Sequence, residues 1–219
     1  MKLLLCPSLA NLTVENFVHE IRTLDEAGCD IFHIDIMDGH FVLNFGMGLP
    51  EFETVRAHTK KMVDVHLIIT EPSRFVEFFA QKGADIIYIH PEADTHPART
   101  LSKIRSLGVK SGIAINPGTS IETVKELFPL VDYVMPMTVN PGFHGQVYMD
   151  YVEPKILRLA EMKDQYGYKI VIDGGVTVEI MERLYKAGVE GYVIGNFVIF
   201  KQEQDYKTIV DRLRKMENT

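Results

Sequence analysis

Short apolar runs alternate with helix-like segments along the whole 219-residue chain, and this alternation constrains the fold more than any other feature of the sequence. The apolar runs are rich in β-branched residues, as buried strands are, and the segments between them carry apolar residues at helical spacing. We expect strands over residues 3–8, 29–39, 62–69, 84–90, 109–116, 132–139, 168–173 and 189–194. We expect helices over residues 13–28, 51–60, 72–82, 97–107, 121–128, 151–165 and 178–187, and a last helical region that ends near residue 216.

Such a succession of strand and helix units predicts parallel βαβ connections. The spacing favours an α/β fold of the (β/α)8 TIM-barrel type, and a doubly wound open sheet is the alternative. The sequence contains no linker or change of composition that would divide it, so we expect residues 1–219 to form a single barrel domain. Pro136 lies inside the sixth expected strand and lacks an amide donor, which predicts a bulge or a locally broken ladder there.

The charge and the cysteine content of the chain indicate which partners and which cellular compartment to expect. The formal net charge is −7 with no concentrated basic patch, which argues against a nucleic-acid partner or an anionic membrane surface. Cys6 and Cys29 are the only cysteines and lie in apolar runs, so we expect buried thiols in a reducing compartment. The first apolar run is too short for a signal peptide, and none is long enough to span a membrane. We therefore expect a cytoplasmic protein.

Polar residues gather at the carboxyl ends of the expected strands, where barrel enzymes place their catalytic groups. Alternation along the second strand puts His33 and Asp35 on one face and the apolar Phe32 and Ile34 on the other. The strand ends carry Ser8, His33, Asp35, His66, His90, Asn116, Asn140, Asp173 and Asn196. Each could be an isolated polar residue at a solvated edge.

Four of these residues, His33, Asp35, His66 and Asp173, belong to the second, third and seventh strands, and a barrel would bring those strand ends together. Two imidazoles with two carboxylates form a mixed nitrogen and oxygen set that suits zinc, iron(II), manganese or cobalt. We therefore expect one divalent metal ion at this position.

Glycine-bearing loops at the same end of the expected barrel indicate a phosphate-binding region. Gly174 and Gly175 follow the seventh strand, and Gly195 and Asn196 follow the eighth, where backbone amides at helix starts can bind phosphate. Glycine pairs also mark ordinary turns. The loop over residues 141–146, after the sixth strand, could fold over a ligand as a lid.

Residues 33–42, 66–67, 137–143 and 173–176 resemble the signatures of the ribulose-phosphate 3-epimerase family, and the similarity extends from Ser8 to Gly195. The resemblance implies a barrel of the ribulose-phosphate-binding type that uses a metal to invert carbon 3 of a ketose phosphate. It makes His33, Asp35, His66 and Asp173 the metal ligands, with Asp35 and Asp173 as the two proton-transfer groups. The residues that it implies for substrate binding, together with the glycine loops, are Ser8, His66, Met37, Met137, Gly142, Phe143, His144, Gly145, Gly174, Gly175, Gly195 and Asn196.

The chain departs from the family pattern at four positions, where Leu43 replaces Pro, Ile68 replaces Met, His144 replaces Gly, and Asn196 replaces Ser or Thr. None of these is an expected metal ligand. The departures therefore leave the expected chemistry intact and bear on the substrate alone. The reaction that the resemblance implies is D-ribulose 5-phosphate to D-xylulose 5-phosphate, through an enediolate, with one carboxylate on each face of the sugar.

Three alternatives remain from the sequence. The first is the same reaction between D-allulose 6-phosphate and D-fructose 6-phosphate, which the His90-Pro91-Glu92 run favours weakly. The second is a non-catalytic barrel that binds a phosphosugar. The third, an aldose–ketose isomerase or a decarboxylase, is disfavoured because no lysine lies at the expected mouth. We also expect a homo-oligomer, since the apolar Phe75, Phe78 and Phe79 could form a subunit contact.

Overall fold

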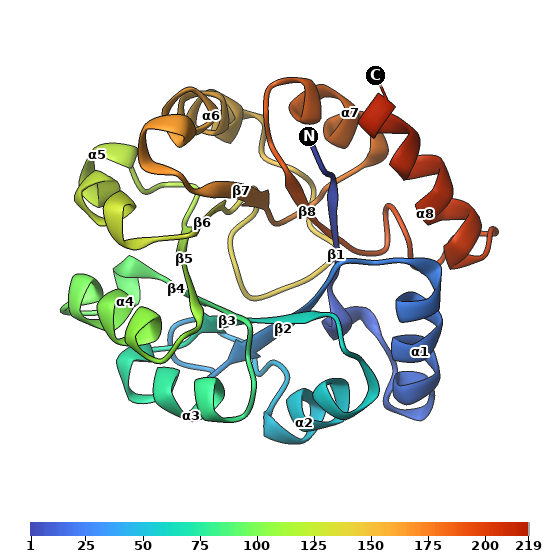
Figure 1. Cartoon of the computed structure of the whole chain (residues 1–219), viewed down its shortest axis with the longest axis horizontal. Helices are drawn as coiled ribbons and strands as arrows, with labels where there is room; N and C mark the ends of the chain where they lie inside the picture. Colours follow the sequence, from blue (N-terminus) through green and yellow to red (C-terminus); the bar gives the residue numbers. More distant parts are fainter. Residues whose placement is uncertain (219) are drawn as a thin grey trace.

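The computed structural model describes residues 1–218, and within them eight parallel strands form a barrel surrounded by helices (Figure 1). The strands are β1 (Leu4–Pro7), β2 (Ile31–Met37), β3 (Met62–Ile68), β4 (Ile86–Ile89), β5 (Lys110–Ile115), β6 (Tyr133–Pro136), β7 (Lys169–Ile172) and β8 (Gly191–Ile194). The helices are α1 (Phe17–Ala27), α2 (Leu49–His58), α3 (Val76–Gln81), α4 (Pro97–Ser106), α5 (Ile121–Val124), α6 (Glu153–Tyr166), α7 (Val178–Lys186) and α8 (Tyr206–Arg214).

The sheet is closed rather than open. Hydrogen-bonded neighbours follow the order β1-β8-β7-β6-β5-β4-β3-β2. A parallel bridge between Ser8 and His33 then joins the two ends, and the Asp30 amide donates to the Leu5 carbonyl at 3.0 Å. The expected (β/α)8 barrel is confirmed, and the doubly wound sheet is excluded.

Alternation along the strands divides the core into two clusters. Phe32 and Ile34 of β2 face outward and join a large cluster between the strands and the helices. A smaller cluster fills the barrel interior and consists of Leu4, Cys6, Ile31, Ile86, Tyr88, Ala114, Tyr133, Met135, Met137, Val171 and Val193. Both cysteines are buried free thiols, as expected. The packed interior leaves the mouth as the place for chemistry.

Pro136 interrupts the ladder between β6 and β7, as the sequence predicts. The register runs from Val134 opposite Ile170 to Met137 opposite Asp173 without a shift, so the strand has a gap in pairing instead of a bulge. The Met137 amide donates to β5, and the next amide, of Thr138, donates to Asp173. The nitrogen of Pro136 therefore faces β7, where it cannot donate.

Several expected helices are shorter in the structure. The helix expected over residues 121–128 is α-helical only to Val124 and continues as a 3-10 helix over Lys125–Leu130, because Pro129 lacks an amide and its ring crowds the preceding turn. Of the three phenylalanines considered for a subunit contact, Phe75, just before α3, and Phe78 are exposed, whereas Phe79 is buried in the core. No helix among residues 1–218 is long and apolar enough to cross a lipid bilayer.

Candidate active site

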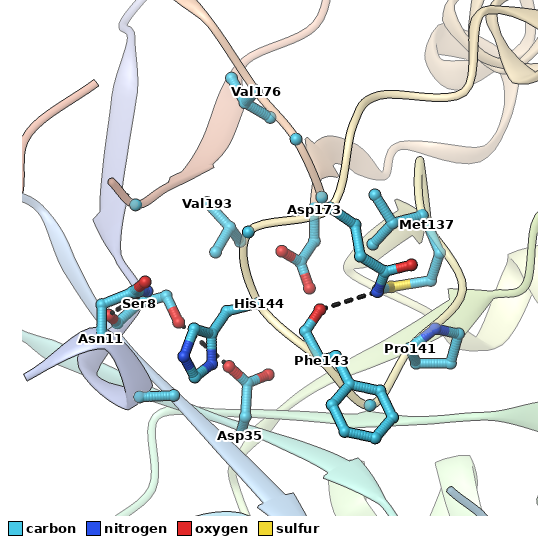
Figure 2. A pocket seen from close by; sticks show the side chains of 18 of the residues that line it. Ser8, Asn11, Asp35, Met137, Pro141, Phe143, His144, Asp173, Val176 and Val193 are labelled. Atoms are coloured by element: carbon cyan, nitrogen blue, oxygen red, sulfur yellow. Dashed lines mark hydrogen bonds between the residues drawn. The ribbon is translucent and has the colours of Figure 1, made fainter. Parts of the chain in front are cut away.

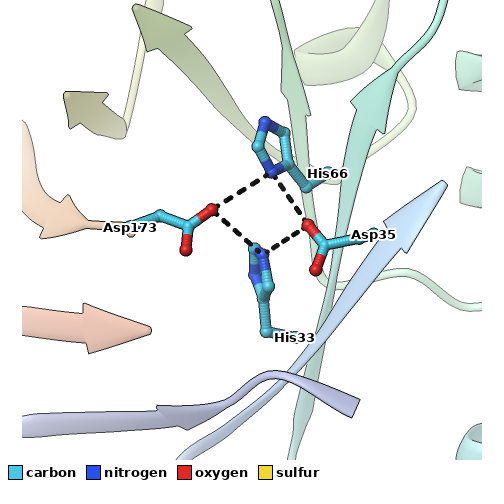
Figure 3. Close-up of side chains that lie close together, drawn as sticks. All are labelled: His33, Asp35, His66 and Asp173. Carbon is cyan, nitrogen blue, oxygen red and sulfur yellow. Dashed lines mark hydrogen bonds and ion pairs between the residues drawn. The ribbon is translucent and has the colours of Figure 1, made fainter. Parts of the chain in front are cut away.

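His33, Asp35, His66 and Asp173 converge at the carboxyl end of the barrel, and we call them the His–Asp quartet (Figure 3). Each residue offers one ligand atom, and these atoms lie within 4.8 Å of one another. His33 Nε2 and His66 Nδ1 lie 3.1 and 3.2 Å from Asp35 Oδ1, and 3.9 and 3.7 Å from Asp173 Oδ2. Figure 3 shows the two carboxylates on opposite sides of the group.

Strand register brings the quartet together. Asp35 of β2 lies opposite His66 of β3, and residues two positions apart on β2 point to the same face, which adds His33. Asp173 directly follows β7 and pairs with Met137 across the interrupted ladder. Ser8, at the end of β1, donates from Oγ to Asp35 Oδ2 at 3.1 Å. Four strand ends therefore fix the two carboxylates and the imidazoles between them.

Each imidazole of the quartet has a buried partner on its far side. His33 Nδ1 forms an ion pair with Asp64 Oδ1 at 2.6 Å, which leaves Nε2 to face the quartet. His66 Nε2 lies 2.9 Å from His90 Nε2, and His90 Nδ1 lies 3.6 Å from Glu92 Oε2. His33, Asp64, His66 and His90 are fully buried. Such partners orient histidine ligands in metal sites.

The pKa shifts of the quartet reflect the crowding of its buried ionisable groups. Burial raises the pKa of Asp173, and the neighbouring Asp35 carboxylate raises it further. Burial opposes ionisation of Asp35 too, but the adjacent His33 and His66 rings hold its pKa below the usual range. Burial lowers the pKa of His66 to about 4, which keeps this imidazole neutral at pH 7.

This donor set fits a divalent cation. A neutral imidazole nitrogen and an ionised carboxylate are the forms that bind transition metals, and a central positive charge would relieve the repulsion between Asp35 and Asp173. The four ligand atoms already face one another from β2, β3 and the end of β7, so little rearrangement is needed. Zinc, iron(II), manganese and cobalt all accept this mixture of ligands.

A cavity opens above the quartet and contains nearly all the expected substrate-binding residues (Figure 2). Asp35 and Asp173 line it at its base. Its walls include Ser8, Met37, Met137, Gly142, Phe143, His144, Gly145, Gly174, Gly175, Gly195 and Asn196. His66 is fully buried and does not line it, so its role lies in the quartet beneath. The structure also adds Asn11 and Phe197 to the wall, which sequence reasoning missed, and Gln146 from the loop expected as a lid.

The loop after β6 covers this cavity. In Figure 1 it is the yellow segment that crosses the centre of the barrel. Gln146 Nε2 donates to the carbonyls of Asn140 and Phe143, both at 2.7 Å, which ties the loop to itself. Asn44 Nδ2 donates to the Gly142 carbonyl at 2.7 Å and ties the loop to the one after β2. The loop thus has the placement of the expected lid.

Gly174 and Gly175 are needed for packing, whatever else they bind. A Cβ on Gly175 would lie 2.4 Å from the Tyr148 nitrogen, and one on Gly174 would lie 2.5 Å from a methyl group of Val139. Both glycines have positive φ, 117° and 61° in chain order. The loop after β7 can therefore approach the loop after β6 only because these residues lack side chains.

The four departures from the family pattern lie in different surroundings. Ile68, His144 and Asn196 line the cavity, and Leu43 is 87% exposed outside it. His144 is exposed at the mouth, where Figure 2 shows its ring directed into the space that Ser8 and Asp35 border. Three of the four substitutions thus change the walls of the cavity and leave the quartet intact.

A family model and the curated sequence relatives of the chain agree on one family. A sequence model described as the ribulose-phosphate 3 epimerase family matches residues 4–199. The chain is 39% identical over 211 residues to a ribulose-phosphate 3-epimerase of Bacillus subtilis (strain 168), covering 95% of this chain and 96% of that protein. It is 40% identical over 200 residues to the ribulose-phosphate 3-epimerase of Synechocystis sp. (strain ATCC 27184 / PCC 6803 / Kazusa), covering 90% and 87%.

Solved structures share the fold at much lower identity. A KGPDC from Streptococcus mutans superposes with a TM-score of 0.71 at 11% identity, over 99% of this chain and 99% of that one. The 3-hexulose-6-phosphate synthase of Salmonella typhimurium gives 0.72 at 14% identity, over 99% and 98%. These similarities support the barrel, whereas the sequence relatives carry the assignment: the chain belongs to the ribulose-phosphate 3-epimerase family and is an isomerase.

Proposed function

We propose that the protein interconverts D-ribulose 5-phosphate and D-xylulose 5-phosphate, with the His–Asp quartet as the site of chemistry. The observation that carries this proposal is the placement of Asp35 and Asp173 on opposite sides of one compact group of ligands. The relatives that match nearly the whole chain in sequence are ribulose-phosphate 3-epimerases. Epimerisation at a carbon next to a ketone requires removal of a proton from one face and delivery to the other.

Asp35 and Asp173 suit these two roles because their surroundings differ. The lowered pKa of Asp35 keeps its carboxylate ionised and able to accept the carbon 3 proton, with Ser8 and two imidazoles holding it in place. The raised pKa of Asp173 makes it the more basic of the two carboxylates, which suits it to carry the proton that is delivered from the other side. In the reverse direction the roles exchange. A bound divalent cation would supply Lewis-acid chemistry that lowers the cost of negative charge on the sugar oxygens.

The walls of the cavity support binding of the rest of a phosphosugar. Met37 and Met137 line it close to the quartet and would exclude water from the planar sugar without competing as hard ligands. The loops that contain Gly174, Gly175 and Gly195 offer backbone amides for a phosphate group. Ser8 and the residues from Gly142 to Gly145 would contact the sugar as the covering loop closes.

The proposal extends to the domain organisation of the protein, its bound ion, its location and its oligomeric state. We propose that residues 1–219 act as one catalytic domain with one bound divalent ion, which is zinc, iron(II), manganese or cobalt, and that the protein works in the cytoplasm. We also propose a homo-oligomer, for which the exposed Phe75 and Phe78 provide an apolar contact.

Deuterium incorporation tests the chemistry. We expect cation-loaded protein, incubated in heavy water with D-ribulose 5-phosphate, to form D-xylulose 5-phosphate that carries deuterium at carbon 3. An unlabelled carbon 3 would favour a barrel that only binds the sugar. The same assay with D-allulose 6-phosphate measures substrate choice, and a higher kcat/KM on the hexulose would replace the pentulose as the substrate.

A further inference from the structure

We infer that His90 and Glu92 are positioning residues that hold His66 in the one tautomer able to bind a cation. In that tautomer Nδ1 of His66 is bare and faces the quartet, and Nε2 carries the proton. The inference rests on the proposed function, since it takes the quartet as a cation site.

The two carboxylates of the quartet would not by themselves select this tautomer of His66. Its Nδ1 lies 3.2 Å from Asp35 Oδ1 and 3.7 Å from Asp173 Oδ2, and two acidic oxygens attract a proton to that nitrogen. A proton there would occupy the position of the cation. Some group on the opposite side of the ring must therefore accept a hydrogen bond from Nε2.

His90 is that group. Its Nε2 lies 2.9 Å from His66 Nε2, and both rings are fully buried, away from bulk solvent. Two ring nitrogens at this distance share one proton, and one ring must donate to the other. The protonation of the far nitrogen of His90 therefore decides the direction of the hydrogen bond.

Glu92 sets that direction. Its Oε2 lies 3.6 Å from His90 Nδ1, and a carboxylate oxygen at the far nitrogen favours a proton on Nδ1. His90 Nε2 is then the bare acceptor, His66 donates from Nε2, and Nδ1 of His66 is left for the cation. The polar groups thus follow one another in the order Glu92 carboxylate, His90 imidazole, His66 imidazole and cation site.

The loop after β5 fixes Glu92 through its other oxygen. Glu92 Oε1 accepts from the Asn116 amide at 2.9 Å and from Thr119 Oγ1 at 2.5 Å. Lys155 holds the same loop by donating to the carbonyls of Asn116 and Pro117 at 2.9 and 2.8 Å. The two carboxylate oxygens therefore have separate tasks, with Oε1 anchoring the side chain and Oε2 facing His90.

This division of tasks makes Glu92→Gln an informative change. The amide oxygen can keep both anchoring contacts, so the fold is retained, but an NH2 group then faces His90 Nδ1. That nitrogen would have to accept, His90 would donate to His66 Nε2, and the proton of His66 would move to Nδ1. An isosteric substitution two residues from His90 thus reverses the direction of the hydrogen bond between His90 and His66.

The test is the affinity of metal-free protein for cobalt(II), measured in competition with a chelator, together with the ring 15N shifts of His66. We expect Glu92→Gln to weaken cobalt binding by about 10- to 100-fold and to move the His66 proton from Nε2 to Nδ1. Thr119→Val, which removes one anchor and keeps the charge, should give a smaller loss in the same direction. Glu71→Gln, at an exposed surface ion pair, is the matched control and should bind as the unchanged protein does.

Wild-type affinity and an unchanged His66 tautomer in Glu92→Gln would overturn the inference while leaving the quartet as a cation site. Failure of the unchanged protein to bind cobalt, or binding that survives in a chain with both Asp35→Asn and Asp173→Asn, would instead overturn the proposed site and the inference with it.

Discussion

His33 Nδ1 lies 2.6 Å from Asp64 Oδ1, and both side chains are fully buried. The two residues lie opposite each other in the register of β2 and β3. A carboxylate so close to Nδ1 keeps the proton on that nitrogen and leaves Nε2 to face the quartet. The two histidines of the quartet therefore have different partners. His33 contacts a carboxylate directly, whereas His66 contacts His90, whose far nitrogen lies 3.6 Å from Glu92.

Asp64→Asn tests the direct arrangement. An amide in this place carries no charge and can present either its oxygen or its NH2 group to His33, so the ligand nitrogen is no longer fixed. We expect cobalt(II) affinity to fall by about 10- to 100-fold, measured on metal-free protein. Asp132→Asn, at the opposite end of the barrel, should leave cobalt affinity unchanged. Equal affinities in the two variants would contradict the role of Asp64.

Asp35→Asn and Asp173→Asn should each lower turnover by at least about 10²-fold, the usual contribution of one acid–base group. Each variant retains one group, which can still exchange the carbon 3 proton of one epimer with solvent. We therefore expect deuterium exchange without inversion, with Asp35→Asn and Asp173→Asn acting on opposite epimers. Exchange of the same epimer by both variants would place both groups on one face of the sugar.

Gly175→Ala should disturb the contact between the loops after β6 and β7. The new Cβ would lie 2.4 Å from the Tyr148 nitrogen, at a residue whose φ is 61°. We expect a loss of unfolding free energy of about 2 kcal/mol and a higher KM for the phosphosugar. Gly167→Ala also has a positive φ but open space around its Cβ, so it should leave KM unchanged. A similar KM for Gly175→Ala and Gly167→Ala would show that the contact between the two loops does not affect substrate binding.

Asp30 anchors the start of the chain and should make stability depend on pH. Partial burial opposes its ionisation, but the Leu5 amide, Lys2 and Arg214 outweigh this effect and lower its pKa. An unfolded aspartate titrates near pH ~3.9, so the stabilisation is complete above about pH 5 and disappears as pH falls through the folded pKa. Urea unfolding should show Asp30→Asn less stable by about 2 kcal/mol at pH 7. This difference should shrink near pH ~3, and a constant difference would exclude the carboxylate as its source.

Much of the site could be predicted from the sequence because strand periodicity places side chains reliably. His33, Asp35 and His66 are on the expected face, and the closed barrel adds Asp173 from a distant part of the chain. Asp64 was missed, although it lies two residues before His66 in an apolar strand, and the same alternation puts both on the inner face.

The contributions of loops were harder to predict, because no periodicity governs them. Nothing in the sequence places Glu92 against His90 on one side and the Asn116 amide on the other. The glycine pair at Gly174 and Gly175 suggested phosphate binding, whereas the structure adds a packing requirement that depends on the loop after the preceding strand. The burial of Phe79 depends on how α3 rotates against the barrel, which a short helix does not reveal.

Stepwise reloading of chelator-treated protein tests the dependence of epimerisation on the quartet most directly. Turnover of D-ribulose 5-phosphate should be lost with the cation, while the protein remains folded. It should then rise in proportion to added cobalt(II) and stop rising at one ion per chain. Turnover that persists in the metal-free protein, or that is restored equally well in a chain with both Asp35→Asn and Asp173→Asn, would contradict the account.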